Sequence, residues 1–479
     1  MDVKKKLLLG LLAVVIAVLF VYFALPDKGM TTYLIEAKYD DGSKTVEAVQ
    51  TVRYVNTTGA SLKEICFHLY PNAFKSEENL PFTKEELPFV YPEGFAPGFI
   101  EIEKVTINGL PAVYTLEEPN DEILRLTLPR EIKKGESVNI KMQYKVKLPP
   151  ARSRFGYGKN TVQLGNWYPI LSVYDKNGWN NDPYYIFGDP FYSDIADYKV
   201  ELTVPEKFVV ACTGEEKEQK VEKGSKKLVI EAHKVRDFAI VMSDKFKVIE
   251  QVVDGIKVKS YYFTEGYGDK VLKFASDAIK FYNDYIGKYP YKEYSVVETD
   301  FYMGGMEYPQ LVMISKDLYN KANLFNLEYV IAHETAHQWW YALVGNNQIR
   351  ESWLDEGLTE YTTLLYIERY YGKATAEEIY RLVIEGGFNK FVNNSADTSF
   401  AKTLADFKEW KEYTNIAYNK GAMVFYNLRK LIGDEDFKKV LQTYYEKYKY
   451  KIATTQDLID VVDSVTGKDT GGFFQSWFY

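Results

Sequence analysis

The sequence predicts an α+β protein of several domains: an N-terminal transmembrane helix, an antiparallel β-sandwich or saddle of sheets, and a mostly helical domain. Three patterns predict this class. Residues 7–25 carry no charge, strand-like alternation recurs over residues 31–246, and helical periodicity dominates from Asn323 onward. The 479 residues suffice for two or three domains at roughly 100–200 residues each. We place the boundaries at residues 1–26, 27–250 and 251–479.

The apolar run from Leu7 to Leu25 has the length of a membrane span. Its 19 residues would form a helix of about 28 Å, close to the ~30 Å hydrocarbon core. Lys4, Lys5 and Lys6 precede it, so the positive-inside rule predicts a single-pass protein of the cell membrane. The N-terminus would be cytoplasmic and the remainder extracytoplasmic. A cleaved signal peptide and a buried core helix are the alternatives.

Residues 31–246 read as strands. Val138 to Leu148 alternate apolar and polar residues, which is typical of a half-buried strand. Ile107-Asn108-Gly109-Leu110 predicts a hairpin turn. Similar short strands recur at residues 33–39, 198–204 and 228–232. Residues 72–98 and 156–192 are rich in Pro, Gly, Asn and aromatics and are expected to form long ordered loops.

After a boundary near residue 250 the pattern becomes mixed and then helical. We expect a helix at residues 270–286 and strands at residues 295–299 and 311–314. A helix from about Asn323 should end at Gly345-Asn346-Asn347, which is a C-cap signature. The next helix should begin near Glu351 or Ser352. The connection of about six residues predicts that these two helices are antiparallel neighbours.

Charge and cysteine content exclude other classes. The net charge is −8, and there is no basic tract beyond Lys4 to Lys6, so nothing favours nucleic-acid binding. Two cysteines are too few for a disulfide scaffold or a thiolate zinc site. An extracytoplasmic location would allow Cys66 and Cys212 to pair; the alternative is two unrelated buried thiols.

A metal-binding pattern lies in the first of these two helices. His333-Glu334-Thr335-Ala336-His337 fits H-E-x-x-H, and four helical residues return both imidazoles to one face. Their Cβ atoms would be about 5–6 Å apart, which suits two nitrogens on one tetrahedral zinc. Glu334 points off this face toward a water. The alternative is two core histidines that are hydrogen-bonded to backbone.

Catalytic zinc requires a third protein ligand, and Glu356 is the candidate. It falls early in the second helix, opposite the histidines. Glu360 lies one turn further and could accept the spare imidazole N–H of a ligand. The alternative for Glu360 is a solvated helix carboxylate. Zinc is the default ion for two imidazoles and one carboxylate, with cobalt and manganese as alternatives.

These residues resemble a known family. His333-Glu334-x-x-His337 followed by Glu356 is similar to the gluzincin pattern, and the flanking residues resemble the zinc aminopeptidases related to aminopeptidase N. Gly304-Gly305-Met306-Glu307-Tyr308 resembles that family's G-x-M-E-N motif, and Tyr418-Asn419-Lys420-Gly421-Ala422 resembles its Y-x-K-G-A motif. Tyr308 and Asp355 depart from the family pattern, which usually has asparagine at both positions.

The resemblance implies roles for these residues. One zinc per chain would be held by His333, His337 and Glu356, with Glu334 as the general base. Tyr418 would donate a hydrogen bond to the developing oxyanion. Glu307, in the loop of Gly304, Gly305 and Met306, would bind the substrate's α-ammonium group. Without the resemblance, Glu307 would be a surface acid after a Gly-Gly turn.

The resemblance thus implies a membrane-anchored zinc aminopeptidase with a thermolysin-like catalytic domain, acting on peptides with a free N-terminus. The chain ends soon after this domain, so we expect an open cleft roofed by the N-terminal sheets. A zinc endopeptidase of the same fold and a non-catalytic interaction module are the alternatives. The preferred N-terminal residue, the physiological substrate and the oligomeric state do not follow from the sequence.

Overall fold

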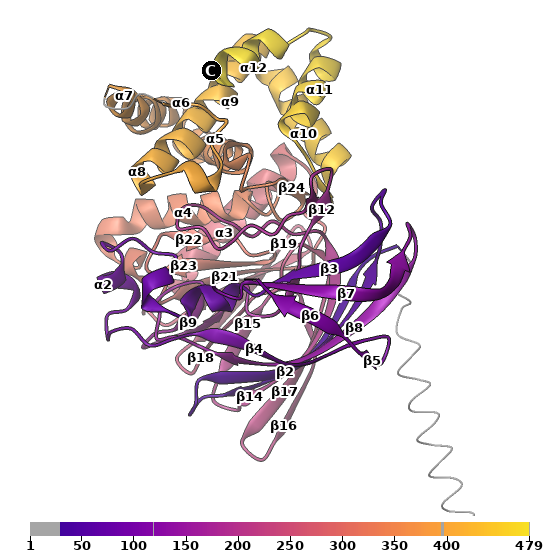
Figure 1. Ribbon diagram of the computed structural model, residues 1–479. Helices are drawn as coiled ribbons and strands as arrows, with labels where there is room; N and C mark the ends of the chain where they lie inside the picture. Colours follow the sequence, from indigo (N-terminus) through magenta and orange to yellow (C-terminus); the bar gives the residue numbers. More distant parts are fainter. Residues whose placement is uncertain (1–28, 118, 394–396, 479) are drawn as a thin grey trace, which may run out of the picture.

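The computed structural model describes residues 29–117, 119–393 and 397–478, with the sheets and the helices segregated along the chain (Figure 1). Across these ranges no helix combines the length and apolarity that a membrane span needs. The predicted transmembrane segment, residues 7–25, lies outside the described residues, so the membrane anchor stays a prediction.

A large sheet of eight strands dominates the N-terminal half. Its order is β16 (Glu215–Glu222), β17 (Ser225–Val235), β14 (Ala196–Pro205), β1 (Thr32–Asp40), β2 (Thr45–Val55), β8 (Ser137–Lys147), β4 (Phe99–Ile107) and β5 (Leu110–Pro111). Along β8 buried and exposed side chains alternate as predicted. The expectation of a wholly antiparallel arrangement was wrong, because β1 and β14 pair in parallel. The long chain between these two strands supplies the crossover that a parallel pair requires.

Smaller sheets complete this half. The first has the order β15 (Val209–Cys212), β18 (Ile240–Ser243), β10 (Val162–Leu164) and β9 (Phe155–Tyr157). The second has the order β11 (Ile170–Leu171), β3 (Leu62–His68), β7 (Ile123–Ile132) and β6 (Val113–Leu116). The third pairs β12 (Tyr174–Asp175) with β13 (Gly178–Trp179).

Three local predictions concern this half. The predicted hairpin joins β4 to β5, with Asn108 and Gly109 at positive φ. The two expected loops are not free of regular structure, because they contain α2 (Leu87–Val90) and the short strands β9 to β13. Cys66 and Cys212 are both free, so they do not pair.

A five-stranded sheet begins the second half. Its order is β19 (Lys247–Val253), β20 (Ile256–Tyr262), β21 (Glu293–Thr299), β23 (Leu311–Ser315) and β22 (Gly305–Met306), and α3 (Gly268–Tyr285) packs against it. One set of its side chains, including Val297 and Met313, joins the core of the N-terminal half, whereas Val296 and Ile314 join the helical core. The sheet therefore lies between the two halves.

Helices follow this sheet: α4 (Leu324–Ala336), α5 (Ser352–Tyr371), α6 (Lys373–Ile379), α7 (Gly386–Val392), α8 (Trp410–Tyr413), α9 (Gly421–Ile432), α10 (Asp434–Tyr448), α11 (Thr455–Thr466) and α12 (Gly471–Phe478). In Figure 1 they occupy the side of the molecule opposite the eight-stranded sheet. The predicted helix at residues 270–286 and the predicted strands at residues 295–299 and 311–314 are confirmed as α3, β21 and β23.

The predicted end of the first motif helix was wrong. Helix α4 stops at Ala336, and Val344–Gly345 forms β24, which pairs in parallel with β25 (Lys451–Ile452). Trp339, Trp340 and Leu343 are fully buried in this connection, so tertiary packing takes the chain out of the helix early. The connection runs over residues 337–351 rather than about six residues. Helix α5 nevertheless begins at Ser352, as predicted.

Candidate metal centre

The structure brings together the three residues predicted as metal ligands. His333 lies in the last turn of α4, His337 caps that helix, and Glu356 lies in the second turn of α5. The Nε2 atoms of the two imidazoles are 3.2 Å apart. Oε2 of Glu356 is 3.6 Å from His333 Nε2 and 3.3 Å from His337 Nε2. These are distances at which three ligand atoms can surround one ion.

Hydrogen bonds on the far side of each ring set its tautomer. His333 Nδ1 is 3.1 Å from Oε2 of Glu360, and His337 Nδ1 is 2.9 Å from Oδ1 of Asp355 and 3.0 Å from the Trp340 carbonyl. Because carboxylates and carbonyls accept, each Nδ1 donates its proton outward. The Nε2 atom of each ring then carries no proton, and its lone pair points toward the Nε2 atom of the other ring.

This donor set fits a divalent cation. Two imidazole lone pairs and a carboxylate oxygen converge in a buried place, and within the part of the chain that the structure describes Oε2 of Glu356 has no hydrogen-bond partner. Such a cluster repels itself unless a positive charge lies between its members. Burial alone lowers the pKa of His337, but Asp355 and Glu307 outweigh it and raise that pKa well above its ordinary value. The surroundings therefore attract positive charge.

Glu334 and Glu307 form a second group beside the first. Their carboxylate oxygens and an imidazole nitrogen of His337 all lie within 4.8 Å of one another. Burial raises the pKa of Glu334 to about 7, against the opposing influence of His333. Burial, with Asp189 nearby, raises the pKa of Glu307 well above its ordinary value. Glu307 is only 4% exposed, and its Oε1 has no hydrogen-bond partner among the described residues.

The loop that carries Glu307 packs directly on Glu334. A Cβ atom on Gly305 would lie 2.4 Å from Oε1 of Glu334, so the missing side chain permits this approach. Met306 is buried, whereas Gly304 is exposed. The glycines therefore form the rim where the site meets solvent.

Tyr418 reaches the metal cluster from a π-helical segment, Thr414–Lys420, between α8 and α9. Its hydroxyl donates to Oε1 of Glu356 at 2.7 Å, and its ring stacks on His333 with centroids 5.7 Å apart. Short π-helical segments recur at functional sites because they re-aim side chains.

Three residues at the site did not emerge from the sequence: Asp189, Arg154 and Tyr413. Asp189 and Arg154 come from the N-terminal half and form a buried ion pair there. Gly188, next to Asp189, packs on Tyr413, whose hydroxyl lies 3.5 Å from Oε1 of Glu356. All three come from segments without a periodic pattern, so only the fold could assign them. The N-terminal half thus contributes residues beside the site, and every predicted ligand and acid is at most 9% exposed; the open cleft stays a prediction.

Comparisons with known proteins agree with this geometry. Residues 271–477 match the Peptidase family M1 domain. Aminopeptidase N of Lactococcus lactis is 28% identical over 230 residues, which is 44% of this chain and 26% of that relative. Leucine aminopeptidase 2-1 of Meyerozyma guilliermondii is 29% identical over 188 residues, which is 37% of this chain and 30% of that relative. The chain thus spans less than a third of the length of these relatives.

Solved structures extend the similarity to the whole fold. The crystal structure of an M1 zinc metallopeptidase from Deinococcus radiodurans superimposes with a TM-score of 0.67 at 17% identity, covering 95% of this chain and 96% of that one. A mutant of the same enzyme bound to a Tyr-Ser-Ala substrate gives a TM-score of 0.68 at 17% identity, covering 95% of both chains. At this identity the similarity shows the fold, in which a sheet-rich N-terminal part precedes a helical part.

Proposed function

Since residues 271–477 match the Peptidase family M1 domain, we propose that this protein is a zinc-dependent aminopeptidase that removes N-terminal residues from peptides. One observation carries the proposal. Glu307 presents a buried carboxylate oxygen without a partner beside Glu334 and the metal ligands. An α-ammonium group is the complement of such an oxygen, and an amine bound there places the first peptide bond next to Glu334.

The residues of the site have different roles in peptide hydrolysis. One zinc ion per chain, held by His333, His337 and Glu356, would supply Lewis acidity that polarises a carbonyl and lowers the pKa of water. Glu334 takes a proton from the attacking water on a carboxylate oxygen and returns it to the leaving amine nitrogen. A pKa of about 7 suits a group that must both accept and release a proton near neutral pH.

Tyr418 and Glu307 position and stabilise the substrate. The Tyr418 hydroxyl lies at the edge of the ligand cluster and would donate to the oxyanion that develops on the scissile carbonyl. Glu307 binds the α-ammonium group and so limits cleavage to the first peptide bond of the substrate.

Blocked substrates test the function directly. The zinc-loaded full chain should hydrolyse aminoacyl chromogenic amides and leave the N-acetylated amides nearly intact. Glu334→Gln should abolish the hydrolysis while the zinc content stays the same. Equal rates on free and blocked amides would instead identify an endopeptidase. No hydrolysis of either, with or without Glu334→Gln, would point to a non-catalytic module.

Glu307 itself has a narrower test. Glu307→Ala should raise KM for free-amine substrates by about 10-fold or more, because the lost contact is a charge-assisted hydrogen bond. Glu307→Gln keeps the shape and should give an intermediate KM. Bound zinc should be the same in both variants. An unchanged KM in Glu307→Ala would remove this residue from the amine site.

We also propose that residues 7–25 anchor the protein in the cell membrane with the catalytic domain outside. The uncharged run and the preceding lysines support this proposal. The full chain should sediment with membranes and resist extraction by high salt or carbonate. Release by salt alone, or a mature N-terminus downstream of residue 25, would contradict an uncleaved anchor.

A further inference from the structure

The loop that carries Glu307 rests on a hairpin of the N-terminal half. This loop, residues 300–308, follows β21, includes the two residues of β22 and leads to β23, and the hairpin, residues 152–166, contains β9 and β10. The backbone N–H of Tyr302 donates to the Arg152 carbonyl at 3.0 Å, and Arg152 Nε donates to the Asp300 carbonyl at 2.9 Å. Arg154 Nε lies 2.8 Å from Sδ of Met306. The two segments therefore touch along their whole length.

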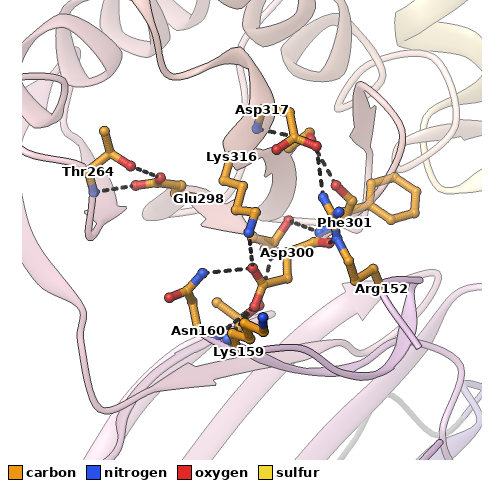
Figure 2. A network of polar contacts seen from close by, with 12 residues as sticks. Arg152, Lys159, Asn160, Thr264, Glu298, Asp300, Phe301, Lys316 and Asp317 are labelled. Carbon is orange, nitrogen blue, oxygen red and sulfur yellow. Dashed lines mark hydrogen bonds and ion pairs between the residues drawn. The ribbon is translucent and has the colours of Figure 1, made fainter. Parts of the chain in front are cut away.

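Asp300 anchors the first end of the loop. Its carboxylate accepts from the backbone N–H of Asn160 at 2.5 Å, from Asn160 Nδ2 at 2.8 Å and from the Thr161 N–H at 3.1 Å. Lys316 Nζ lies 3.0 Å away on the catalytic side (Figure 2). Burial alone raises the pKa of Asp300, but these hydrogen bonds and Lys316 outweigh it and lower that pKa. Asp300 is thus held as a carboxylate.

Tyr308 anchors the other end. Its hydroxyl donates to Oδ1 of Asn166 at 2.6 Å, and Asn166 Nδ2 donates to Oδ2 of Asp237 at 2.6 Å. Tyr308 is fully buried. A Cβ atom on Gly165 would lie 2.1 Å from the Tyr308 hydroxyl oxygen, so the hairpin has no side chain where the ring enters. A tyrosine reaches this partner in the N-terminal half, whereas the asparagine typical of the related family is shorter.

The two anchors bracket one short strand. Asn160 and Thr161 lie just before β10, and Asn166 lies two residues after it. Glu307 adjoins the second anchor, yet its own Oε1 has no hydrogen-bond partner. Its position is therefore set by its neighbours rather than by its own contacts. A carboxylate that must meet an ammonium within hydrogen-bond distance needs such support from surrounding groups.

We propose that Tyr308 and Asn166 at one end, and Asp300 and Asn160 at the other, are positioning residues that fix Glu307 for recognition of the substrate's amino terminus. This inference rests on the proposed aminopeptidase function. It makes the residues that flank β10 in the N-terminal half determinants of exopeptidase specificity, although none of them is a catalytic residue.

Tyr308→Phe is the direct test, because it removes one hydroxyl and keeps the buried ring. KM for a free-amine aminoacyl amide should rise about 5-fold, which corresponds to one hydrogen bond, while kcat stays within about 2-fold. Zinc content should be unchanged. Asn166→Ala should act similarly, and the double variant should be no worse than the worse single variant, since both remove the same bond. Tyr448→Phe, which removes a hydroxyl bonded to Asp457 at 2.8 Å, is the matched control and should leave KM unchanged.

The outcomes separate this inference from the function itself. If the wild-type protein fails to distinguish free from N-acetylated amides, the proposed function fails. If the wild-type protein distinguishes them and Tyr308→Phe leaves KM unchanged, or lowers kcat or zinc content alone, the positioning role is refuted. Should Tyr308→Phe not fold, Asn160→Ala tests the other anchor. It removes the side-chain bond to Asp300 and an exposed bond from Lys245, leaves the backbone bond to Asp300, and should raise KM about 2- to 3-fold.

Discussion

The two carboxylates behind the zinc-binding imidazoles should contribute unequally to metal affinity. In the described part of the chain, His333 Nδ1 has one acceptor, Oε2 of Glu360 at 3.1 Å. His337 Nδ1 has Asp355 at 2.9 Å and also the Trp340 carbonyl at 3.0 Å. Glu360→Ala would leave a buried N–H without a partner, whereas Asp355→Ala leaves a backbone carbonyl in place.

Loss of such an outer partner typically weakens metal binding by about 10- to 100-fold, or ~1.4–2.7 kcal/mol. We expect Glu360→Ala at the upper end of this range, because the imidazole also loses its orientation. Asp355→Ala should fall near 10-fold, because the Trp340 carbonyl remains as an acceptor for His337 Nδ1. The expected ratio between the two dissociation constants is therefore about 10.

Competition with a chromophoric chelator measures both dissociation constants on metal-free protein. Glu368→Ala is the matched control, since Glu368 lies on the same helix and pairs with Arg429 at 2.7 Å. It should bind zinc like the wild type. Circular dichroism of each metal-free variant checks that the fold is intact. Equal constants for the two variants, or weaker binding in Asp355→Ala, would refute the reasoning from acceptor number.

Three further predictions follow from close contacts and burial. Gly357→Ala should destabilise the fold by about 1–3 kcal/mol in urea unfolding, because its Cβ would lie 2.5 Å from the Gly421 Cα where α5 crosses α9; an unchanged midpoint would contradict this packing. Gly305→Ala should lower kcat about 10-fold or more at unchanged zinc content, because its Cβ would displace Glu334; a normal kcat would show that Glu334 can move freely. Burial lowers the pKa of His68 from 6.5 to about 4. Between these two pH values His68 binds a proton in the unfolded state but not in the folded state. Stability should therefore fall by about 3 kcal/mol as the pH drops from 6.5 to 4, and the neutral variant His68→Gln should lose correspondingly less; parallel pH profiles of the two proteins would exclude this origin.

The sequence predicted the local features of the fold well. The alternation in β8, the Asn108-Gly109 turn and the amphipathic α3 each follow from a short-range pattern, and the structure confirms them. The end of α4 could not be predicted in this way. Three buried side chains and the pairing of β24 with β25 override a C-cap signature, because tertiary burial outweighs the small propensity terms of a helix end.

The residues of the candidate site also differ in whether a local sequence pattern predicts them. His333, Glu334 and His337 were predictable because four helical residues bring two side chains to one face whatever the rest of the chain does. The hydrogen-bond partners of the two imidazoles were not equally predictable. Glu360 was predictable from helix periodicity, whereas the contacts of Asp355, Arg154 and Asp189 depend on how α5 and the N-terminal half meet the motif helix.

The sequence by itself determined the candidate metal centre: two imidazoles and two carboxylates at spacings that helices convert directly into proximity. The tertiary structure alone decided what surrounds that chemistry. It placed a hairpin of the N-terminal half under the Glu307 loop and buried Tyr308 against Asn166, a contact across 142 residues of sequence. Local periodicity carries no information about such a contact, because it exists only when two separately folded parts of the chain pack together.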